Sequence, residues 1–297
     1  MSANPLVQRL AVIGCGLMGG SFALALKSRG LVSQVSGFSS RASTRERALA
    51  LGVIDQACES VAQAVAGADV VLLAVPVQAT ELTLRALAPH LDPHALLMDV
   101  GSTKSDVIAA ARETLGLALP RFVPAHPIAG KEVAGVEHAE ADLYRHRQVF
   151  LTPIEPTDPR FTARAQAVWL SVGARVNTLD AAFHDTAFAA VSHLPHLLAF
   201  AYMNGLSAQA QGAPFIGMGG PGFRDFSRIA ASDPTVWRDI LLANRQEVLS
   251  QWAHTRAALA EFEQAMLAGD GERLSALIER SRQARSGWRM TGETESD

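Results

Sequence analysis

Hydrophobic and polar positions follow two different patterns along this chain, and the pattern changes near residue 180. Before that point, short apolar runs with the length of buried strands alternate with stretches in which apolar positions have a helical spacing. The expected strands cover residues 10–13, 34–38, 70–75, 96–100, 121–125, 149–152 and 174–178, and the helical patterns cover 19–29, 41–51, 77–90 and 104–115. This alternation predicts βαβ units and an α/β Rossmann-type fold with a doubly wound, mostly parallel sheet.

The rest of the chain predicts helices only. A long apolar helix is expected over residues 181–207, followed by a loop rich in glycine and proline. Asp233 and Pro234 suit the N-cap and first turn of another helix, which should run to about residue 267 and precede a last helix. The sequence thus predicts an α/β domain of residues 1–179 and an all-α C-terminal domain of residues 180–297.

The composition and the net charge of the chain argue against several classes of function. Hydrophobic residues make up 48% of the 297 positions and charged residues 19%, which is typical of a globular protein. The net charge of −3 indicates no basic surface for nucleic acid, and no apolar run has the roughly 18 residues of a membrane helix. The N-terminus shows no secretory pattern, and two cysteines are too few for a disulfide framework. We therefore expect a cytoplasmic protein that binds neither nucleic acid nor membranes.

A glycine-rich loop joins the first expected strand to the first helix. Gly14, Gly16 and Gly19 have the spacing GxGxxG, and Leu17 and Met18 stand between the last two. The first glycine permits a tight turn, the second lets a pyrophosphate approach the backbone, and the third lets the helix pack on the strand. The positive end of the helix then faces the pyrophosphate. A tight turn without a ligand would also use glycine, but the strand and helix on either side favour a dinucleotide site.

The end of the second expected strand bears on the choice of cofactor. NAD-binding proteins usually carry an acidic residue there, which binds the ribose hydroxyls. This chain instead has Ser39, Ser40 and Arg41, with Thr44 shortly after. Hydroxyls and a guanidinium bind a 2′-phosphate through charge-assisted hydrogen bonds, so NADP is favoured over NAD. The alternative is that Arg41 is a solvated residue at the start of a helix.

Other strands also end in residues that suit a binding or catalytic role. Ligands of open α/β sheets bind at the carboxyl ends of strands, so we expect Val75 and Pro76 beside the cofactor and Ser102 near its nicotinamide. His126 follows a later strand, where a neutral imidazole can take a proton from a substrate hydroxyl. The alternatives are an N-cap role for Ser102 and a structural role for His126.

The helical part carries two more groups of polar residues. Ser192 and His196 share one face of the long apolar helix, beside Pro195, which should kink that helix. They suit a substrate contact or a structural role, and no metal site is indicated because no acidic ligand adjoins them. Asp225 and Arg228 follow the glycine-rich loop, where an arginine suits recognition of a carboxylate. An Arg–Asp ion pair is the alternative.

Taken in order, these segments resemble the prephenate/arogenate (cyclohexadienyl) dehydrogenase family of tyrosine biosynthesis. The matching stretches are GCGLMGGS at 14–21, DVGSTK at 99–104, HPIAGKEVAG at 126–135, SHLPH at 192–196 and GFRDFSRIAASDPTVWRDI at 222–240. Because they occur in the family's order over most of the chain, the set is far more specific than any one motif.

The resemblance implies oxidative decarboxylation of prephenate, arogenate or both, with hydride transfer to NADP or NAD and 4-hydroxyphenylpyruvate or tyrosine plus CO₂ as products. It implies that His126 is the base for the ring hydroxyl and that Ser102 orients that hydroxyl. It also implies that the helical domain binds substrate and forms a homodimer. The residues that it assigns to the substrate pocket are Ser192, His196, Arg228, Glu132 and Asp225.

Two other classes of protein share such a fold. Dehydrogenases of the β-hydroxyacid or ketopantoate type use a catalytic lysine on a helix, but residues 181–224 of this chain contain no lysine. A non-catalytic protein that senses NAD(P) would keep the glycine loop, but it would have no reason to combine His126, His196 and Arg228. We therefore expect an NAD(P)-dependent dehydrogenase.

Overall fold

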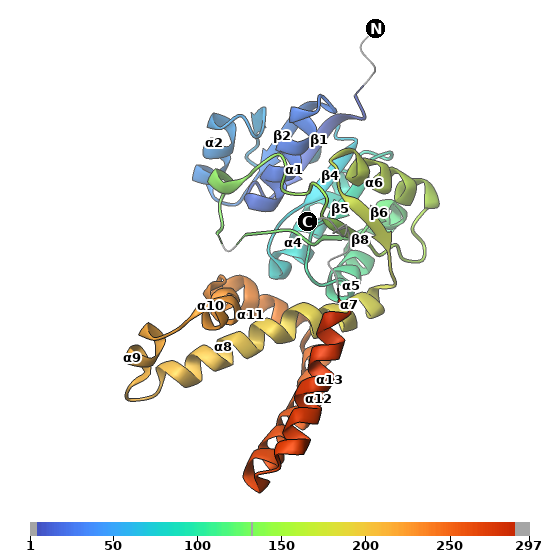
Figure 1. Cartoon of the computed structure of the whole chain (residues 1–297). Helices are drawn as coiled ribbons and strands as arrows, with labels where there is room; N and C mark the ends of the chain where they lie inside the picture. The colour runs from blue at the N-terminus through green and yellow to red at the C-terminus, as the bar shows by residue number, and fades with distance from the viewer. Residues whose placement is uncertain (1–4, 132, 289–297) are drawn as a thin grey trace. The chain divides into compact units, whose positions relative to one another are not determined.

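The computed structural model describes residues 5–131 and 133–288, and its α/β part is built on a six-stranded sheet (Figure 1). Neighbouring strands run parallel in the order β3-β2-β1-β4-β5-β6. The strands are β1 (Val7–Ile13), β2 (Val32–Phe38), β3 (Gln56–Ala57), β4 (Val70–Leu73), β5 (Leu96–Asp99) and β6 (Phe122–Val123). The direction of winding reverses between β1 and β4, which is where such sheets bind ligands. The predicted fold class is confirmed.

Helices cover both faces of the sheet because successive residues of a strand point to opposite sides. Leu10 and Val12 of β1 pack in one apolar core, whereas Ala11 and Ile13 pack in the other. The flanking helices are α1 (Leu17–Ser28), α2 (Ala42–Ala50), α3 (Val61–Val65), α4 (Thr80–Leu87), α5 (Ser105–Thr114) and α6 (Pro159–Ser171). Side chains of α1, α2 and α6 enter the first core, and those of α3, α4 and α5 enter the second.

Three further strands form a second sheet, whereas the sequence predicted one continuous sheet. β7 (Ala125–Pro127) pairs antiparallel with β8 (Gln148–Leu151), and β8 pairs parallel with β9 (Arg175–Thr178). The expected strand over 121–125 is thus divided between β6 and β7 at Pro124, which has no N–H with which to continue a ladder. This division puts His126 in the middle of β7.

The long apolar helix is present but is irregular in its middle. α7 (Ala181–Phe188) and α8 (Leu194–Ser207) are joined by a π-helical segment, Ala189–His193. Pro195 has no N–H, and its ring would collide with the carbonyl four residues earlier in a regular helix. The wider π turn just before it accommodates the proline.

Two expectations for the following segment are wrong. The glycine- and proline-rich stretch is not a simple loop, because it forms α9 (Gly212–Gly217), α10 (Pro221–Ser227) and a 3₁₀ turn at Arg228–Ala231. Proline is tolerated in the first turn of α10, where its missing N–H has no partner to lose. The next helix is interrupted rather than continuous, with α11 (Pro234–Ala243) ahead of α12 (Arg245–Ala268). At the break, the Asn244 side chain is buried and donates a hydrogen bond to the carbonyl of Asp185 (2.7 Å).

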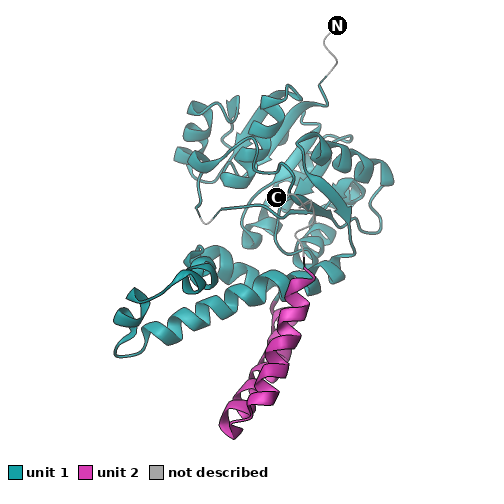
Figure 2. Cartoon of the chain, viewed as in Figure 1, with its two compact units in different colours: residues 1–244 teal, residues 245–297 magenta. Residues whose placement is uncertain are grey.

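The chain divides into two compact units, residues 1–244 and 245–297 (Figure 2). The first unit contains the α/β part together with α7 to α11, so its limit differs from the domain boundary that the sequence predicts. The described part of the second unit is a pair of helices, α12 and α13 (Gly271–Ser286). Within the described residues, no helix is long and apolar enough to cross a membrane.

Candidate active site

Each of the three glycines of the first loop has a different structural role. Gly14 has a φ of +103°, and a Cβ there would lie 2.1 Å from the carbonyl oxygen of Ala74. A Cβ on Gly19 would lie 2.2 Å from the carbonyl oxygen of Gly14, so glycine lets α1 pack against the loop. A Cβ on Gly16 would meet nothing within 4 Å. The first and third glycines are therefore required by the fold, whereas the second leaves open space in front of the loop.

The N-terminus of α1 suits an anion. Gly16 is the N-cap residue of α1 and supplies no side-chain cap, and the first turn carries no acidic residue. The N–H groups of that turn and the positive end of the helix dipole can therefore bind a phosphate. This environment fits the pyrophosphate of a dinucleotide.

The end of β2 is joined to this loop by Ser39. The Ser39 hydroxyl accepts a hydrogen bond from the backbone N–H of Cys15 (2.8 Å), and the Ser39 carbonyl accepts one from the Arg45 guanidinium (2.6 Å). Ser40 and Arg41 are exposed and Thr44 is half-buried. Sequence reasoning missed Arg45, although its position four residues after Arg41 on α2 was the available signal. Two arginines thus follow the end of β2.

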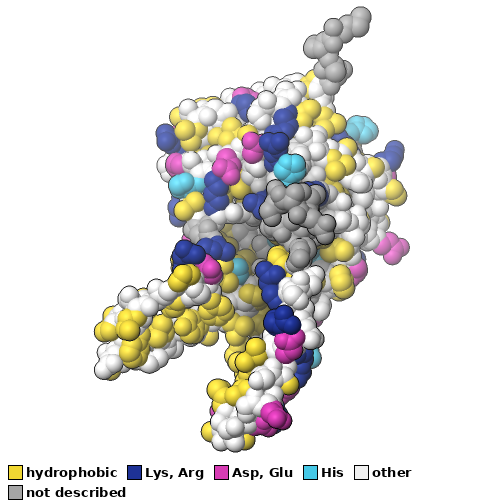
Figure 3. Space-filling model, viewed as in Figure 1, with side chains coloured by type: hydrophobic (Ala, Val, Ile, Leu, Met, Phe, Trp, Pro, Cys, Tyr) yellow, Lys and Arg dark blue, Asp and Glu magenta, His cyan; other side chains and the backbone are white. Residues whose placement is uncertain are grey.

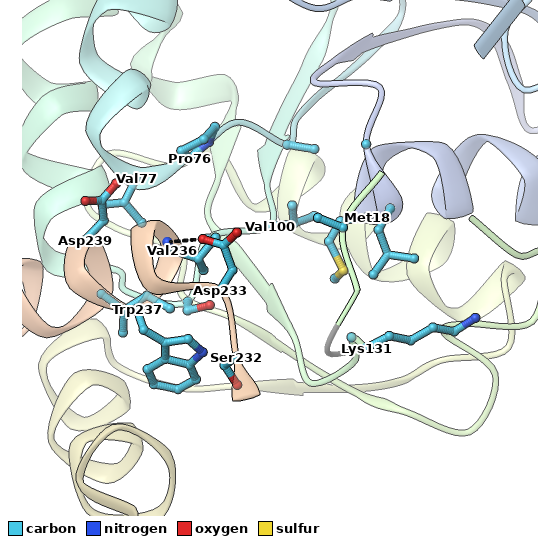
Figure 4. Close-up of a pocket in the computed structure, with 18 of the residues that line it drawn as sticks. Met18, Pro76, Val77, Val100, Lys131, Ser232, Asp233, Val236, Trp237 and Asp239 are labelled. Atoms are coloured by element: carbon cyan, nitrogen blue, oxygen red, sulfur yellow. Dashed lines mark hydrogen bonds between the residues drawn. The ribbon is translucent and has the colours of Figure 1, made fainter. Parts of the chain in front are cut away.

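A cleft of about 770 Å³ opens in front of the glycine loop. One wall comes from the start of α1 and the carboxyl end of β5, where Met18 and Val100 project into the space (Figure 4). The predicted site residues on its lining are Gly16, Leu17, Met18, Val75, Pro76, Ser102 and His196. The cleft therefore combines five of the residues expected to bind the cofactor with Ser102 of the predicted catalytic pair and His196 of the predicted substrate pocket. The other residues expected to bind the cofactor do not line it, namely Gly14, Gly19, Ser39, Ser40, Arg41 and Thr44.

The opposite wall of the cleft comes from the start of α11 (Figure 4). Asp233 caps this helix by accepting hydrogen bonds from the N–H groups of Thr235 (2.8 Å) and Val236 (3.0 Å). Trp237 stacks on His196, with ring centroids 3.4 Å apart and an angle of 19° between the rings. Because a backbone carbonyl can only accept, His196 donates from Nδ1 to the Ser192 carbonyl (2.9 Å). This wall offers a flat aromatic surface, and sequence reasoning assigned Trp237 no role in the site.

The imidazole of His126 is buried between β7 and α7. Its Nδ1 lies 2.8 Å from Nε2 of His184, and its ring packs edge-on against Phe188 with 4.7 Å between ring centroids. His126 is 8% exposed, and it is not among the residues that line the cleft. The histidine is thus almost fully buried, does not line the cleft and contacts a second imidazole.

His184 is in turn hydrogen-bonded to a carboxylate. Its Nδ1 lies 2.9 Å from Oδ1 of Asp185. The same carboxylate accepts hydrogen bonds from the backbone N–H groups of Lys104 (2.9 Å) and Ser105 (2.8 Å) at the start of α5. His126, His184 and Asp185 therefore form a buried chain that ends on a helix N-terminus.

A buried ion pair connects the Ser102 loop to β7. The ammonium of Lys104 contacts Asp99 and donates to the carbonyl of Ala125 (2.9 Å). The Asp99 carboxylate also accepts from the N–H of Ala125 (2.9 Å) and from that of Gly101 (2.8 Å). Since Ala125 precedes His126, this ion pair fixes the backbone of the two predicted catalytic residues relative to each other.

The electrostatics of this region favour a neutral imidazole at position 126. Burial lowers the pKa of His126 well below its ordinary value of 6.5, and the neighbouring His184 and Lys104 lower it further. Burial alone would raise the pKa of Asp185, but the hydrogen bonds from His184 and from the start of α5 outweigh it and leave that pKa below its ordinary value. At neutral pH, His126 is therefore able to accept a proton and Asp185 is an anion.

Three other predicted substrate residues that the structure describes, Ser192, Asp225 and Arg228, do not line the cleft. Ser192 lies in the π-helical segment, and the exposed Arg228 begins a 3₁₀ turn. Asp225 is exposed and its carboxylate pairs with Arg224 (3.0 Å). Glu132 lies outside the described residues.

The Rossmann-type sheet, the glycine loop and a buried neutral histidine beside a cleft define an NAD(P)-dependent dehydrogenase. Two family models match: prephenate dehydrogenase, nucleotide-binding domain, over residues 22–178, and prephenate dehydrogenase, dimerization domain, over residues 180–280. The chain therefore belongs to the prephenate dehydrogenase family. The alternative dehydrogenase types and the non-catalytic alternative are not favoured.

Known relatives agree with this assignment over most of their length. The chain is 34% identical to a cyclohexadienyl dehydrogenase of Zymomonas mobilis over 280 residues, which covers 94% of this chain and 95% of that protein. It is similar to the crystal structure of prephenate dehydrogenase from Aquifex aeolicus in complex with hydroxyphenyl propionate and NAD⁺ (TM-score 0.88, 32% identity, 96% and 99% coverage). It is also similar to Synechocystis arogenate dehydrogenase (TM-score 0.79, 28% identity, 94% and 99% coverage).

Proposed function

We propose that the chain catalyses the oxidative decarboxylation of prephenate, arogenate or both, with NADP as the favoured hydride acceptor. The observation that carries this proposal is the buried imidazole of His126, whose backbone is tied to the Ser102 loop at the carboxyl edge of the sheet by the Lys104–Asp99 ion pair. The names of the relatives support the substrate class. The hydroxyphenyl ring bound in the A. aeolicus structure matches the ring that this reaction would leave.

In the proposed reaction, His126 takes the proton of the ring hydroxyl while the hydrogen on the same carbon leaves as hydride. A nicotinamide cofactor, when bound, would supply the acceptor for that hydride. The carbon becomes a carbonyl, and the bond to the ring carboxylate then breaks, so that CO₂ leaves and its electron pair completes the aromatic ring. The oxygen recovers its proton from His126, which is then neutral for the next turnover. Ser102 orients the hydroxyl toward the imidazole.

Each part of the cofactor has a proposed set of contacts. The loop of Gly14, Gly16, Leu17, Met18 and Gly19 would hold the pyrophosphate, and Val75 and Pro76 would line the cleft beside it. Ser39, Ser40, Arg41 and Thr44 would hold the adenosine ribose and its 2′-phosphate, with Arg45 adding a second positive charge.

The substrate would occupy the part of the cleft between Ser102 and α11. His196 and Trp237 would form its aromatic wall. Ser192 and Arg228 are proposed to hold its polar groups, with Arg228 as the partner of a carboxylate. Glu132 and Asp225 are proposed to shape the entrance of the pocket.

We also propose that the helical part forms a homodimer. The name of the family model over residues 180–280 supports this assembly. Hydrophobic side chains gather over α8 and α9 (Figure 3), among them the exposed Tyr202, Phe215 and Met218. The domain boundary is proposed at residues 179/180, and the two buried, free cysteines support a reducing, cytoplasmic compartment.

The function is tested by following NAD(P)H absorbance with both substrates and both cofactors. We expect turnover of prephenate or arogenate and a higher kcat/KM with NADP than with NAD. The Arg41→Ala variant should raise KM for NADP about tenfold, because it loses one charge-assisted contact, and should leave KM for NAD unchanged. A preference of the wild type for NAD would contradict the cofactor assignment, and no turnover of either substrate would contradict the proposed function.

The Arg228→Ala variant is expected to raise KM for the substrate by about 10–100-fold with little change in kcat. The reason is that a carboxylate contact is made in the ground state and the transition state alike. Steady-state kinetics at saturating cofactor measure this change. Arg160→Ala, which removes an exposed arginine of α6 paired with Asp158, is the control. An unchanged KM in Arg228→Ala would assign the carboxylate to another residue.

A further inference from the structure

We propose that His184 and Asp185 are positioning residues that fix the tautomer of His126 and share the positive charge that His126 acquires. This inference rests on the proposed function of His126 as the base. It concerns two residues that lie 58 and 59 positions further along the chain and that no sequence motif connected with the site.

The direction of each hydrogen bond follows from the group at the end of the chain. Asp185 accepts from two backbone N–H groups at the start of α5, and its lowered pKa keeps it ionised at neutral pH. An ionised carboxylate only accepts, so Nδ1 of His184 must donate to it across 2.9 Å. In a neutral His184, Nε2 is then an acceptor.

The same reasoning determines the state of His126. With His184 in its neutral form, its Nε2 accepts, so Nδ1 of His126 donates across the 2.8 Å that separates them. A neutral imidazole has one N–H, so Nε2 of His126 keeps its lone pair. The base is thus held in the one tautomer in which Nε2 can take a proton from a hydroxyl, and its ring is held in place by Phe188.

The Asp185 carboxylate also offsets the positive charge that His126 acquires. Once protonated, His126 is a buried cation close to the ammonium of Lys104, whose own partner is Asp99. The other titratable groups around this chain are Asp106 of α5 and His193, whose pKa burial lowers to about 4. Asp185 is the anion that is hydrogen-bonded to the histidine pair. Movement of the Nδ1 proton of His126 onto Nε2 of His184 would place the positive charge next to this carboxylate.

Two substitutions of His184 separate positioning from charge sharing. Gln can still accept the hydrogen bond from His126 but cannot carry a proton, so His184→Gln should lower kcat by about tenfold. Leu has no acceptor, so His184→Leu should lower kcat by roughly 10²–10³-fold. Asp185→Asn removes the anion and should lower kcat at least as much as His184→Gln. KM for the cofactor should not change in any of them, because the glycine loop is untouched.

The control is Phe150→Leu, which loosens the packing beside His184 without touching a hydrogen bond. Its kcat should remain within about twofold of the wild type, and melting temperatures identify any variant that fails to fold. If His184→Leu and Phe150→Leu lower kcat equally, or if His184→Gln is as slow as His184→Leu, the positioning role is wrong.

A measurement without substrate keeps this inference separate from the proposed function. In the ¹⁵N-histidine-labelled wild type, NMR should show His126 and His184 both with the proton on Nδ1 at neutral pH. A proton on Nε2 of His126 would overturn the inference even if the enzyme turns over prephenate. Conversely, the histidines could show the expected tautomers in a protein that turns over neither substrate. That result would support the hydrogen-bond chain and contradict the proposed reaction.

Discussion

Replacement of His126 by Asn is expected to lower kcat by about 10²–10⁴-fold, which is the usual contribution of a positioned general base. Asn is polar, and its amide N–H can still donate a hydrogen bond toward His184, which His126 contacts in the wild type. It has no group that accepts a proton at neutral pH. The loss should therefore fall on kcat, with KM for the cofactor unchanged.

The pH dependence of the wild type supplies an independent check on the same residue. Because burial holds the pKa of His126 well below 6.5, the neutral base remains the dominant form as pH falls through 6.5. The value of kcat/KM, which reports ionisations of the free enzyme, should show no decline from this residue down to and below that pH, and should fall only in more acidic solution, where the imidazole becomes protonated. A decline centred on pH 6.5 would indicate an exposed histidine as the base.

The control for this variant is His94→Asn, which alters an exposed histidine just before the amino end of β5, whereas the predicted catalytic residues follow the carboxyl ends of strands. It should keep the wild-type kcat. Cofactor affinity, measured by fluorescence quenching, should be equal in the wild type and in both variants. Near-normal turnover in His126→Asn would remove His126 from the mechanism.

The sequence predicted those parts of the site that depend on local geometry. Gly14, Gly16 and Gly19 are recognisable because a strand, a turn and a helix follow one another directly. Ser102 and Val75 could be placed because strand ends in a parallel sheet meet at one edge, and the structure has both on the cleft. These inferences needed only the order of the elements.

Residues that meet through tertiary packing could not be placed in the same way. His184 and Asp185 stand in the apolar helix AAFHDTAF, and two adjacent polar residues that become buried there were the available signal. Their partners, His126 and the start of α5, come from other elements, and no spacing rule links them. In the sequence, Asn244 likewise looks like an ordinary helical residue. Only the structure shows its hydrogen bond to the Asp185 carbonyl. Backbone patterns locate the edges of elements, whereas side-chain hydrogen bonds between elements depend on the packed fold.

Replacement of Gly19 by Ala is expected to weaken cofactor binding by at least tenfold and to lower the melting temperature by several degrees. The added Cβ would lie 2.2 Å from the carbonyl oxygen of Gly14 and 2.7 Å from Cγ1 of Val12. Neither atom is the free end of a flexible side chain, so α1 must move away from β1, at a cost of about 1–3 kcal/mol. The N–H groups at the start of α1 move with it, and the pyrophosphate loses its partners.

Gly16→Ala is the matched variant, because its Cβ meets no protein atom within 4 Å. It should weaken cofactor binding by filling the space proposed for the pyrophosphate, while the melting temperature of the apoprotein stays within about a degree of the wild type. Alanine is the better helix former by about 1 kcal/mol, so a lower melting temperature in Gly19→Ala can only come from the collision. Thermal unfolding without ligand and fluorescence titration with NADP measure the two effects separately. Equal melting temperatures for the two variants would show that α1 does not depend on close contact at Gly19, and unchanged NADP affinity in Gly16→Ala would place the pyrophosphate elsewhere.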